Sequence, residues 1–266
     1  MSNRYSWVGS WVDYVDEKKT IQIEHLIAGH FGGCSTAGQY KNEDGCLVFV
    51  NTEEDWEFTI LLDAHNTAES AELVVSTFLD EEIRIREIMS KSLSVAFTEI
   101  EDLVLTILNK EEFKKDCAAL TGETAALFVG RKGKYVWWLS VGDCLLYVLH
   151  PELNALGEVQ LNQRSFYEWI GQVNTFDLPV PSYSRGIKEL RTGVNHILLT
   201  TDGLIECPNE PFNNPTAIFQ EFKGCSIEEG VQRLLIEIEN NHVRDSTTIL
   251  SWKVHISDVA TKPSNA

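Results

Sequence analysis

Five aspartates lie at the edges of apolar, strand-like runs of this sequence. Asp63 and Asp202 end such runs, Asp44 and Asp245 shortly precede them, and Asp143 follows a further run by one residue. A carboxylate beside a buried strand is costly unless a cation compensates it, because loss of hydration disfavours the charged form. Each aspartate taken alone is more typical of a turn or a cap, but their repetition indicates a bound metal.

Strand direction places several of these aspartates side by side. Two apolar runs between residues 46 and 62 are separated by a polar turn, which is typical of a β-hairpin. The start of the first strand and the end of the second lie at the same edge of an antiparallel hairpin, so we expect Asp44 and Asp63 to be neighbours. If the strands next to Asp202 and Asp245 also pair antiparallel, those two carboxylates share an edge as well.

The remaining chain alternates between helix and strand patterns. Apolar residues spaced by three and four predict two helices packed on a sheet, over 67–78 and 83–108. A capping box at Ser226 and Glu229 begins a further helix. Apolar runs predict further strands at 20–27, 124–129, 135–141, 145–149 and 196–201. Asp143 is then expected in a tight turn between two successive strands.

We expect a single domain over residues 1–256, because 266 residues can bury one large core and no linker interrupts the pattern. Residues 151–193 are irregular and resemble a flap-like insertion over a rigid scaffold. Residues 257–266 are expected to form a disordered tail.

The composition is strongly acidic, with 22 Lys and Arg against 40 Asp and Glu and a formal net charge of −18. Such a charge repels nucleic acid and anionic membranes and attracts cations. No stretch approaches a membrane span, residues 1–20 do not resemble a signal peptide, and the six cysteines lack zinc-like spacing. We therefore expect a cytoplasmic protein with no nucleic-acid or membrane partner, while the oligomeric state stays open.

Carboxylates without a cysteine or histidine cluster are hard oxygen ligands, which favour Mg²⁺ or Mn²⁺ over zinc or copper. Two such ions about 3.5 to 4 Å apart could share a water, lower its pKa and direct it at a phosphorus atom. No spacing typical of a Ser, Cys or His catalytic triad stands out. The pattern thus favours phosphoryl hydrolysis by direct attack of water.

Six short segments resemble, in order, the motifs of the metal-dependent Ser/Thr protein phosphatases of the 2C type. They are Asn42-Glu43-Asp44-Gly45, Leu62-Asp63-Ala64-His65, Gly122-Glu123-Thr124-Ala125, Val141-Gly142-Asp143-Cys144, Thr201-Asp202-Gly203-Leu204 and Asp245-Ser246-Thr247-Thr248. The resemblance implies an α+β fold, a four-layer α/β/β/α sandwich of two mainly antiparallel sheets flanked by helices. It also implies a dinuclear metal site at one end of the sandwich.

The resemblance further implies which residues act at that site. The implied metal ligands are the side chains of Asp44, Asp63, Asp202 and Asp245, the backbone carbonyl of Ala64, and Asp143 for a third, weaker ion. His65 matches the histidine proposed as general acid to the leaving alcohol, and Glu43 would contact metal-bound water.

Three positions depart from the family pattern. Ala64 stands where a glycine is usual, and Leu145 replaces an arginine. The arginine that binds phosphate is missing, and Lys41 is the available cation, which can neutralise a phosphate but cannot form the bidentate fork.

The leading hypothesis is a phosphatase that hydrolyses phosphoserine or phosphothreonine in proteins by attack of a water bridging two Mg²⁺ or Mn²⁺ ions. The alternative is a binding or regulatory protein that keeps the fold with weak or no catalysis, as the three departures suggest. A metal-dependent nuclease is disfavoured by the net charge of −18 and by the absence of a basic groove pattern.

Overall fold

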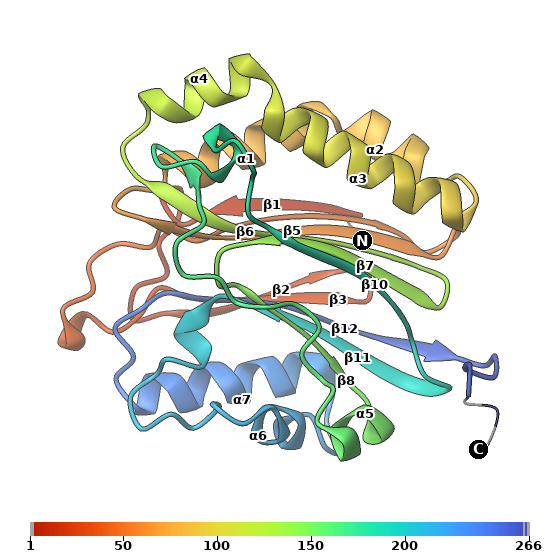
Figure 1. Cartoon of the computed structure of the whole chain (residues 1–266). Helices are drawn as coiled ribbons and strands as arrows, with labels where there is room; N and C mark the ends of the chain where they lie inside the picture. Colours follow the sequence, from red (N-terminus) through yellow and green to blue (C-terminus); the bar gives the residue numbers. More distant parts are fainter. Residues whose placement is uncertain (1–2, 263, 265–266) are drawn as a thin grey trace.

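The computed structural model describes residues 3–262 and 264, which form four layers (Figure 1). Two sheets face each other, and helices cover their outer faces. Each named strand pairs antiparallel with its neighbours. The sandwich expected from the sequence motifs is confirmed.

The first sheet has the strand order β1-β4-β5-β6-β7-β10, and a short strand β9 pairs with β6. Its strands are β1 (Arg4–Val8), β4 (Gly45–Asn51), β5 (Trp56–His65), β6 (Glu123–Lys132), β7 (Tyr135–Val141), β9 (Ile170–Gly171) and β10 (Ser184–Glu189). The second sheet has the order β2-β3-β12-β11-β8. Its strands are β2 (Lys18–Ile23), β3 (Leu26–Phe31), β8 (Leu145–Leu149), β11 (Gly193–Thr200) and β12 (Thr247–Ile256).

The helices divide between the two outer faces (Figure 1). The first sheet is covered by α1 (Glu69–Asp80), α2 (Glu82–Met89), α3 (Leu93–Asn109) and α4 (Glu111–Ala119). The second is covered by α5 (Pro151–Leu156), α6 (Pro215–Glu221) and α7 (Ile227–Asn240). Short 3-10 turns η1 (Ser35–Ala37), η2 (Thr175–Asp177) and η3 (Asp202–Leu204) complete the structure. None of the helices in the described part of the chain combines the length and apolar character needed to traverse a lipid bilayer.

Both faces of the central strands are buried, which explains their continuous apolar sequences. Successive side chains of a strand point to opposite faces. On β4, Cys46 and Val48 join the core between the sheets, whereas Leu47 and Phe49 pack under the helices. The strand therefore contributes to two hydrophobic cores at once.

The structure contains more helices than the sequence pattern predicts. The single helix expected over 83–108 is two helices, α2 and α3, and α4 was not predicted. The Ser90 hydroxyl donates to the Arg86 carbonyl (2.8 Å), and Ser92 is the N-cap residue of α3. Serines favour helix ends over interiors, because their hydroxyls bond nearby backbone groups.

Two expected strand features also differ. The run 20–27 is the β2–β3 hairpin, which turns at Glu24 with a positive φ of 51°. The turn that carries Asp143 does not join two strands of one hairpin, because β7 belongs to the first sheet and β8 to the second. The segment around Asp143 thus crosses between the sheets.

The segment 151–193, predicted to be irregular, contains some regular structure. Its last part forms β10, which extends the first sheet beside β7. Residues 258–261, expected in a disordered tail, contact the end of this segment: the Thr192 hydroxyl donates to the Asp258 carbonyl (2.8 Å), and Ala260 is buried. Residues 263, 265 and 266 of that tail lie outside the described residues.

Candidate functional site

The β4–β5 hairpin brings two predicted ligands to one edge. Gly45 pairs with Leu62, so Asp44 and Asp63 stand at adjacent positions just beyond this pair. Both side chains are buried. The neighbourhood expected from the hairpin pattern is confirmed.

The second sheet supplies two more aspartates in the same way. Thr200 of β11 pairs with Ile249 of β12, which confirms the antiparallel pairing on which their proximity depends. Asp202 follows β11 and opens η3, while Asp245 precedes β12. Asp202 is buried and Asp245 is exposed.

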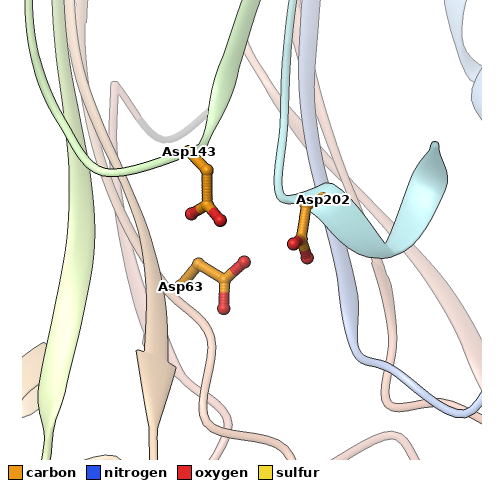
Figure 2. A group of neighbouring side chains, drawn as sticks. All are labelled: Asp63, Asp143 and Asp202. Carbon is orange, nitrogen blue, oxygen red and sulfur yellow. The ribbon is translucent and has the colours of Figure 1, made fainter. Parts of the chain in front are cut away.

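Three of the five carboxylates form a tight group. One oxygen each of Asp63, Asp143 and Asp202 lies within 4.8 Å of the others. Figure 2 shows the three side chains pointing toward one common space from β5, from the crossing between the sheets and from η3. Asp143, expected as the ligand of a third, weaker ion, is one of these three residues, and the charges of Asp44 and Asp245 also act on Asp63.

The group is electrostatically unfavourable without a cation. Burial, followed by the charge of Asp202, raises the pKa of Asp63 well above its usual range. Burial and the charges of Asp245 and Asp143 raise the pKa of Asp202 to about 7. Like charges in a buried site favour protonation unless a cation is present.

The donor set fits a divalent cation of the Mg²⁺ type. Every side chain in the group is a carboxylate, and hard cations prefer oxygen ligands. Oδ1 of Asp143 is buried and has no hydrogen-bond partner, although buried polar atoms in proteins are nearly always paired. A bound cation would complete its coordination.

Asp44 is held in place by the segment before β4 and by the residue that follows β11. Its backbone N–H donates to Asn42 Oδ1 (3.0 Å), and its Oδ2 accepts a hydrogen bond from Thr201 Oγ1 (3.2 Å).

Ala64 lies on β5 next to Asp63, and only Asn66, two residues further on, has a positive φ among residues 63–66. An alanine is therefore compatible with the backbone at position 64, and its carbonyl keeps its capacity as a ligand.

The remaining predicted residues lie around the group. His65 ends β5 and is exposed, and its ring contacts Trp169 edge-on at a centroid distance of 4.8 Å. Lys41 Nζ donates to Glu43 Oε1 (2.5 Å) and to the Asn66 carbonyl (2.8 Å). The lysine expected to meet phosphate is thus engaged by a neighbouring carboxylate.

The sequence patterns did not reveal Arg164. Its Nη2 lies 2.6 Å from Glu206 Oε1, 3.5 Å from Asp202 Oδ2 and 3.8 Å from Asp143 Oδ2. This guanidinium partly offsets the negative charge at one side of the group. It belongs to the irregular segment 151–193, where no periodicity indicated which side chains return to the site.

A cavity of about 360 Å³ opens beside the aspartates. Its lining residues are Gln39, Tyr40, Lys41, Glu43, Arg244 and Asp245. Three predicted site residues thus line this cavity, namely Lys41, Glu43 and Asp245. Arg244 lines it as well, although the sequence patterns did not indicate this residue.

No protein-family profile and no curated protein sequence matches the chain. Solved structures are similar over nearly its whole length. A serine/threonine phosphatase of S. agalactiae has a TM-score of 0.58 and 15% identity, covering 95% of this chain and 100% of that chain. The catalytic domain of the serine/threonine protein phosphatase PstP with two manganese ions has a TM-score of 0.56 and 15% identity, with coverages of 86% and 97%. RsbX in complex with magnesium has a TM-score of 0.55 and 12% identity, with coverages of 89% and 100%. The chain shares the fold of these bacterial proteins.

Proposed function

We propose that this protein is a Mg²⁺- or Mn²⁺-dependent phosphatase that hydrolyses phosphoserine and phosphothreonine in proteins. The observation that carries the proposal is the convergence of Asp63, Asp143 and Asp202, whose oxygens lie within 4.8 Å of one another. The fold adds support, because solved structures with this fold include serine/threonine phosphatases, one of them with two manganese ions.

In this proposal the chain supplies an all-oxygen metal site. The ligands would be the carboxylates of Asp44, Asp63, Asp202 and Asp245 and the carbonyl of Ala64, with Asp143 available to a third ion. When bound, two divalent ions would neutralise charge on the phosphoryl group and lower the pKa of a shared water that attacks phosphorus.

In this proposal the side chains around the metal site donate a proton to the leaving group and hold the attacking water. His65 is exposed at the end of β5, where it can donate a proton to the leaving alcohol oxygen. Its edge contact with Trp169 restricts the orientation of its ring. Glu43, fixed by Lys41, would hold the attacking water by accepting a hydrogen bond from it.

The natural substrate would be a phosphoprotein in the cytoplasm. All six cysteines are free, and five of them are buried, which is consistent with a reducing compartment.

The test is release of phosphate from a phosphothreonine peptide in the presence of Mn²⁺. Asp202→Asn should reduce kcat by more than the ~100-fold typical of outer-shell partners, because it removes a ligand. Asp102→Asn, an equal change at an exposed position on α3, should leave the rate unchanged. Activity that persists in EDTA would contradict the metal mechanism.

One observation favours the second candidate, a binding or regulatory protein with weak or no catalysis. Lys41, the cation expected to meet phosphate, is paired with Glu43. Calorimetry that detects Mn²⁺ binding to a protein with no hydrolysis of any phosphopeptide would support this alternative.

A further inference from the structure

The cavity beside Asp245 contains two cationic side chains, Lys41 and Arg244. Lysine has three donors, and two of those on Lys41 already bond Glu43 and the Asn66 carbonyl. The charge of Lys41 is also neutralised locally by Glu43. Little of its capacity remains for an anion that enters the cavity.

Arg244 is in a different situation. It lies directly before Asp245 and its side chain is exposed in the cavity lining. Across the described part of the chain, its guanidinium forms no ion pair or hydrogen bond with another residue. An arginine has five donors in a rigid fork, so all of them remain available to a ligand.

The backbone that carries Arg244 is well fixed. Cys34 N–H donates to the Val243 carbonyl (2.9 Å). Gly33, with a φ of 84°, packs so closely that a Cβ there would lie 2.1 Å from the Arg244 carbonyl oxygen. An exposed arginine on a fixed backbone loses less freedom on binding than one on a loose loop.

We propose that Arg244 binds the phosphoryl oxygens of the substrate, a role that rests on the proposed phosphatase function. A phosphate monoester carries up to two negative charges, and the surrounding carboxylates and the net charge of −18 repel it. A guanidinium matches two phosphoryl oxygens at once, which lysine cannot do. Because Arg244 adjoins Asp245, a phosphate held by it stays next to the metal ligands.

The experiment compares wild type, Arg244→Ala and Arg244→Lys, all loaded with Mn²⁺. We measure KM and kcat for p-nitrophenyl phosphate, which has no flanking residues, and the binding of inorganic phosphate by calorimetry. Arg244→Ala should raise KM and the phosphate Kd about 10- to 100-fold, as expected for hydrogen bonds to a charged group. Arg244→Lys should be intermediate, and kcat should change less than KM.

The matched control is Arg84→Ala, which makes the same charge change at an exposed position on α2. It should leave KM, kcat and phosphate binding as in wild type. Mn²⁺ affinity of Arg244→Ala should stay the same or rise, since a cation has been removed.

Three results would overturn the assignment of Arg244. One is an unchanged phosphate Kd in Arg244→Ala. Another is an unchanged KM for p-nitrophenyl phosphate in Arg244→Ala, because Arg244 would then make no contact with the phosphoryl group of a substrate. The third is a large loss of Mn²⁺ affinity, which would mean that Arg244 acts through Asp245. A wild type that binds phosphate through Arg244 but hydrolyses nothing would contradict the phosphatase function alone.

Discussion

Thr201 Oγ1 lies 3.2 Å from Asp44 Oδ2, and this hydrogen bond joins the ends of the two sheets at the aspartate group. The same hydroxyl oxygen accepts the backbone N–H of Thr248 on β12 (3.0 Å). One buried hydroxyl therefore orients a predicted metal ligand and satisfies a strand amide at once. Side chains in this position determine how accurately the ligands converge.

Thr201→Val keeps the shape of the side chain and removes both hydrogen bonds. We expect Mn²⁺ affinity to fall about 10- to 100-fold, as when other outer-shell partners are lost. The buried Thr248 amide left without a partner should lower the free energy of unfolding by about 1 to 3 kcal/mol. Calorimetry and urea unfolding measure the two effects.

The control for this change is Thr59→Val, also buried on β5 but bonded to the Val129 carbonyl and away from the aspartates. It should leave Mn²⁺ affinity unchanged. Equal affinities for Thr201→Val and wild type would show that Asp44 does not depend on this hydroxyl.

Arg164→Gln should tighten Mn²⁺ binding. The guanidinium lies within 4 Å of the Asp143 and Asp202 carboxylates and competes with a metal for them. Removing it also removes a repulsive charge, so the Mn²⁺ Kd should decrease several-fold while the metal-free protein becomes less stable. Titration calorimetry and thermal unfolding in EDTA check both directions. Weaker Mn²⁺ binding would instead mean that Arg164 orients the ligands.

The matching control is Arg185→Gln, which breaks a pair with Glu101 between β10 and α3. Mn²⁺ affinity should not respond to it, because neither residue belongs to the aspartate group or to the cavity beside it.

Glu57→Gln should strongly destabilise the fold without affecting the metal site. Glu57 lies near the start of β5, at the end opposite Asp63, and accepts hydrogen bonds from Arg131 Nε (2.6 Å) and His25 Nε2 (2.7 Å). Burial alone would raise the pKa of Glu57, but Arg131 and His25 outweigh this effect and the pKa is lowered. The substitution leaves Arg131 buried with less compensation, which costs about 3 to 5 kcal/mol for a broken buried pair.

Urea unfolding measures that loss. The comparison variant is Glu82→Gln, whose pairs with Arg4 and Arg86 lie at the surface and should contribute at most about 1 kcal/mol. If the free energy of unfolding falls by a similar amount in the two variants, the buried Glu57–Arg131 pair stabilises the fold no more than a surface pair does.

Local patterns were sufficient to predict the aspartate positions that depend on strand pairing. An antiparallel hairpin has only one arrangement of its ends, so the hairpin pattern alone predicts that Asp44 lies beside Asp63. The position of Asp143 was harder to predict, because a Gly-Asp turn has the same sequence pattern whether it closes a hairpin or crosses between sheets. Only the tertiary arrangement brings one of its carboxylate oxygens within 4.8 Å of oxygens of Asp63 and Asp202.

The cations of the site could not be predicted from pattern. Arg164 lies in a segment without periodicity, and its approach to Asp202 depends on the path of the whole insertion. The role of Lys41 as the phosphate-binding cation stays a prediction, and its pairing with Glu43 is a side-chain arrangement with no sequence signal. Arg244 became a candidate site residue only because the structure places it in the lining of the cavity with Lys41.

His30 should make the protein less stable as the pH falls. Burial lowers the pKa of His30 from 6.5 to about 3, and its ring is enclosed by Tyr5, Trp7 and Tyr14. Between pH 6.5 and about 3 the unfolded chain binds a proton at this histidine that the folded chain does not. Unfolding then takes up a proton, so acid favours the unfolded state by up to about 1.4 kcal/mol per pH unit.

The contribution is separated from other titrating groups by comparing variants in EDTA. His30→Gln should show a shallower loss of unfolding free energy below pH 6.5 than wild type. Tyr5→Phe removes the hydrogen bond between Tyr5 Oη and His30 Nε2 (3.1 Å) but keeps the histidine, so it should shift stability at every pH and leave the slope as in wild type. Denaturant titrations at intervals from pH 7.5 to 4.5 give these slopes. Parallel curves for wild type and His30→Gln would mean that His30 binds its proton equally in both states.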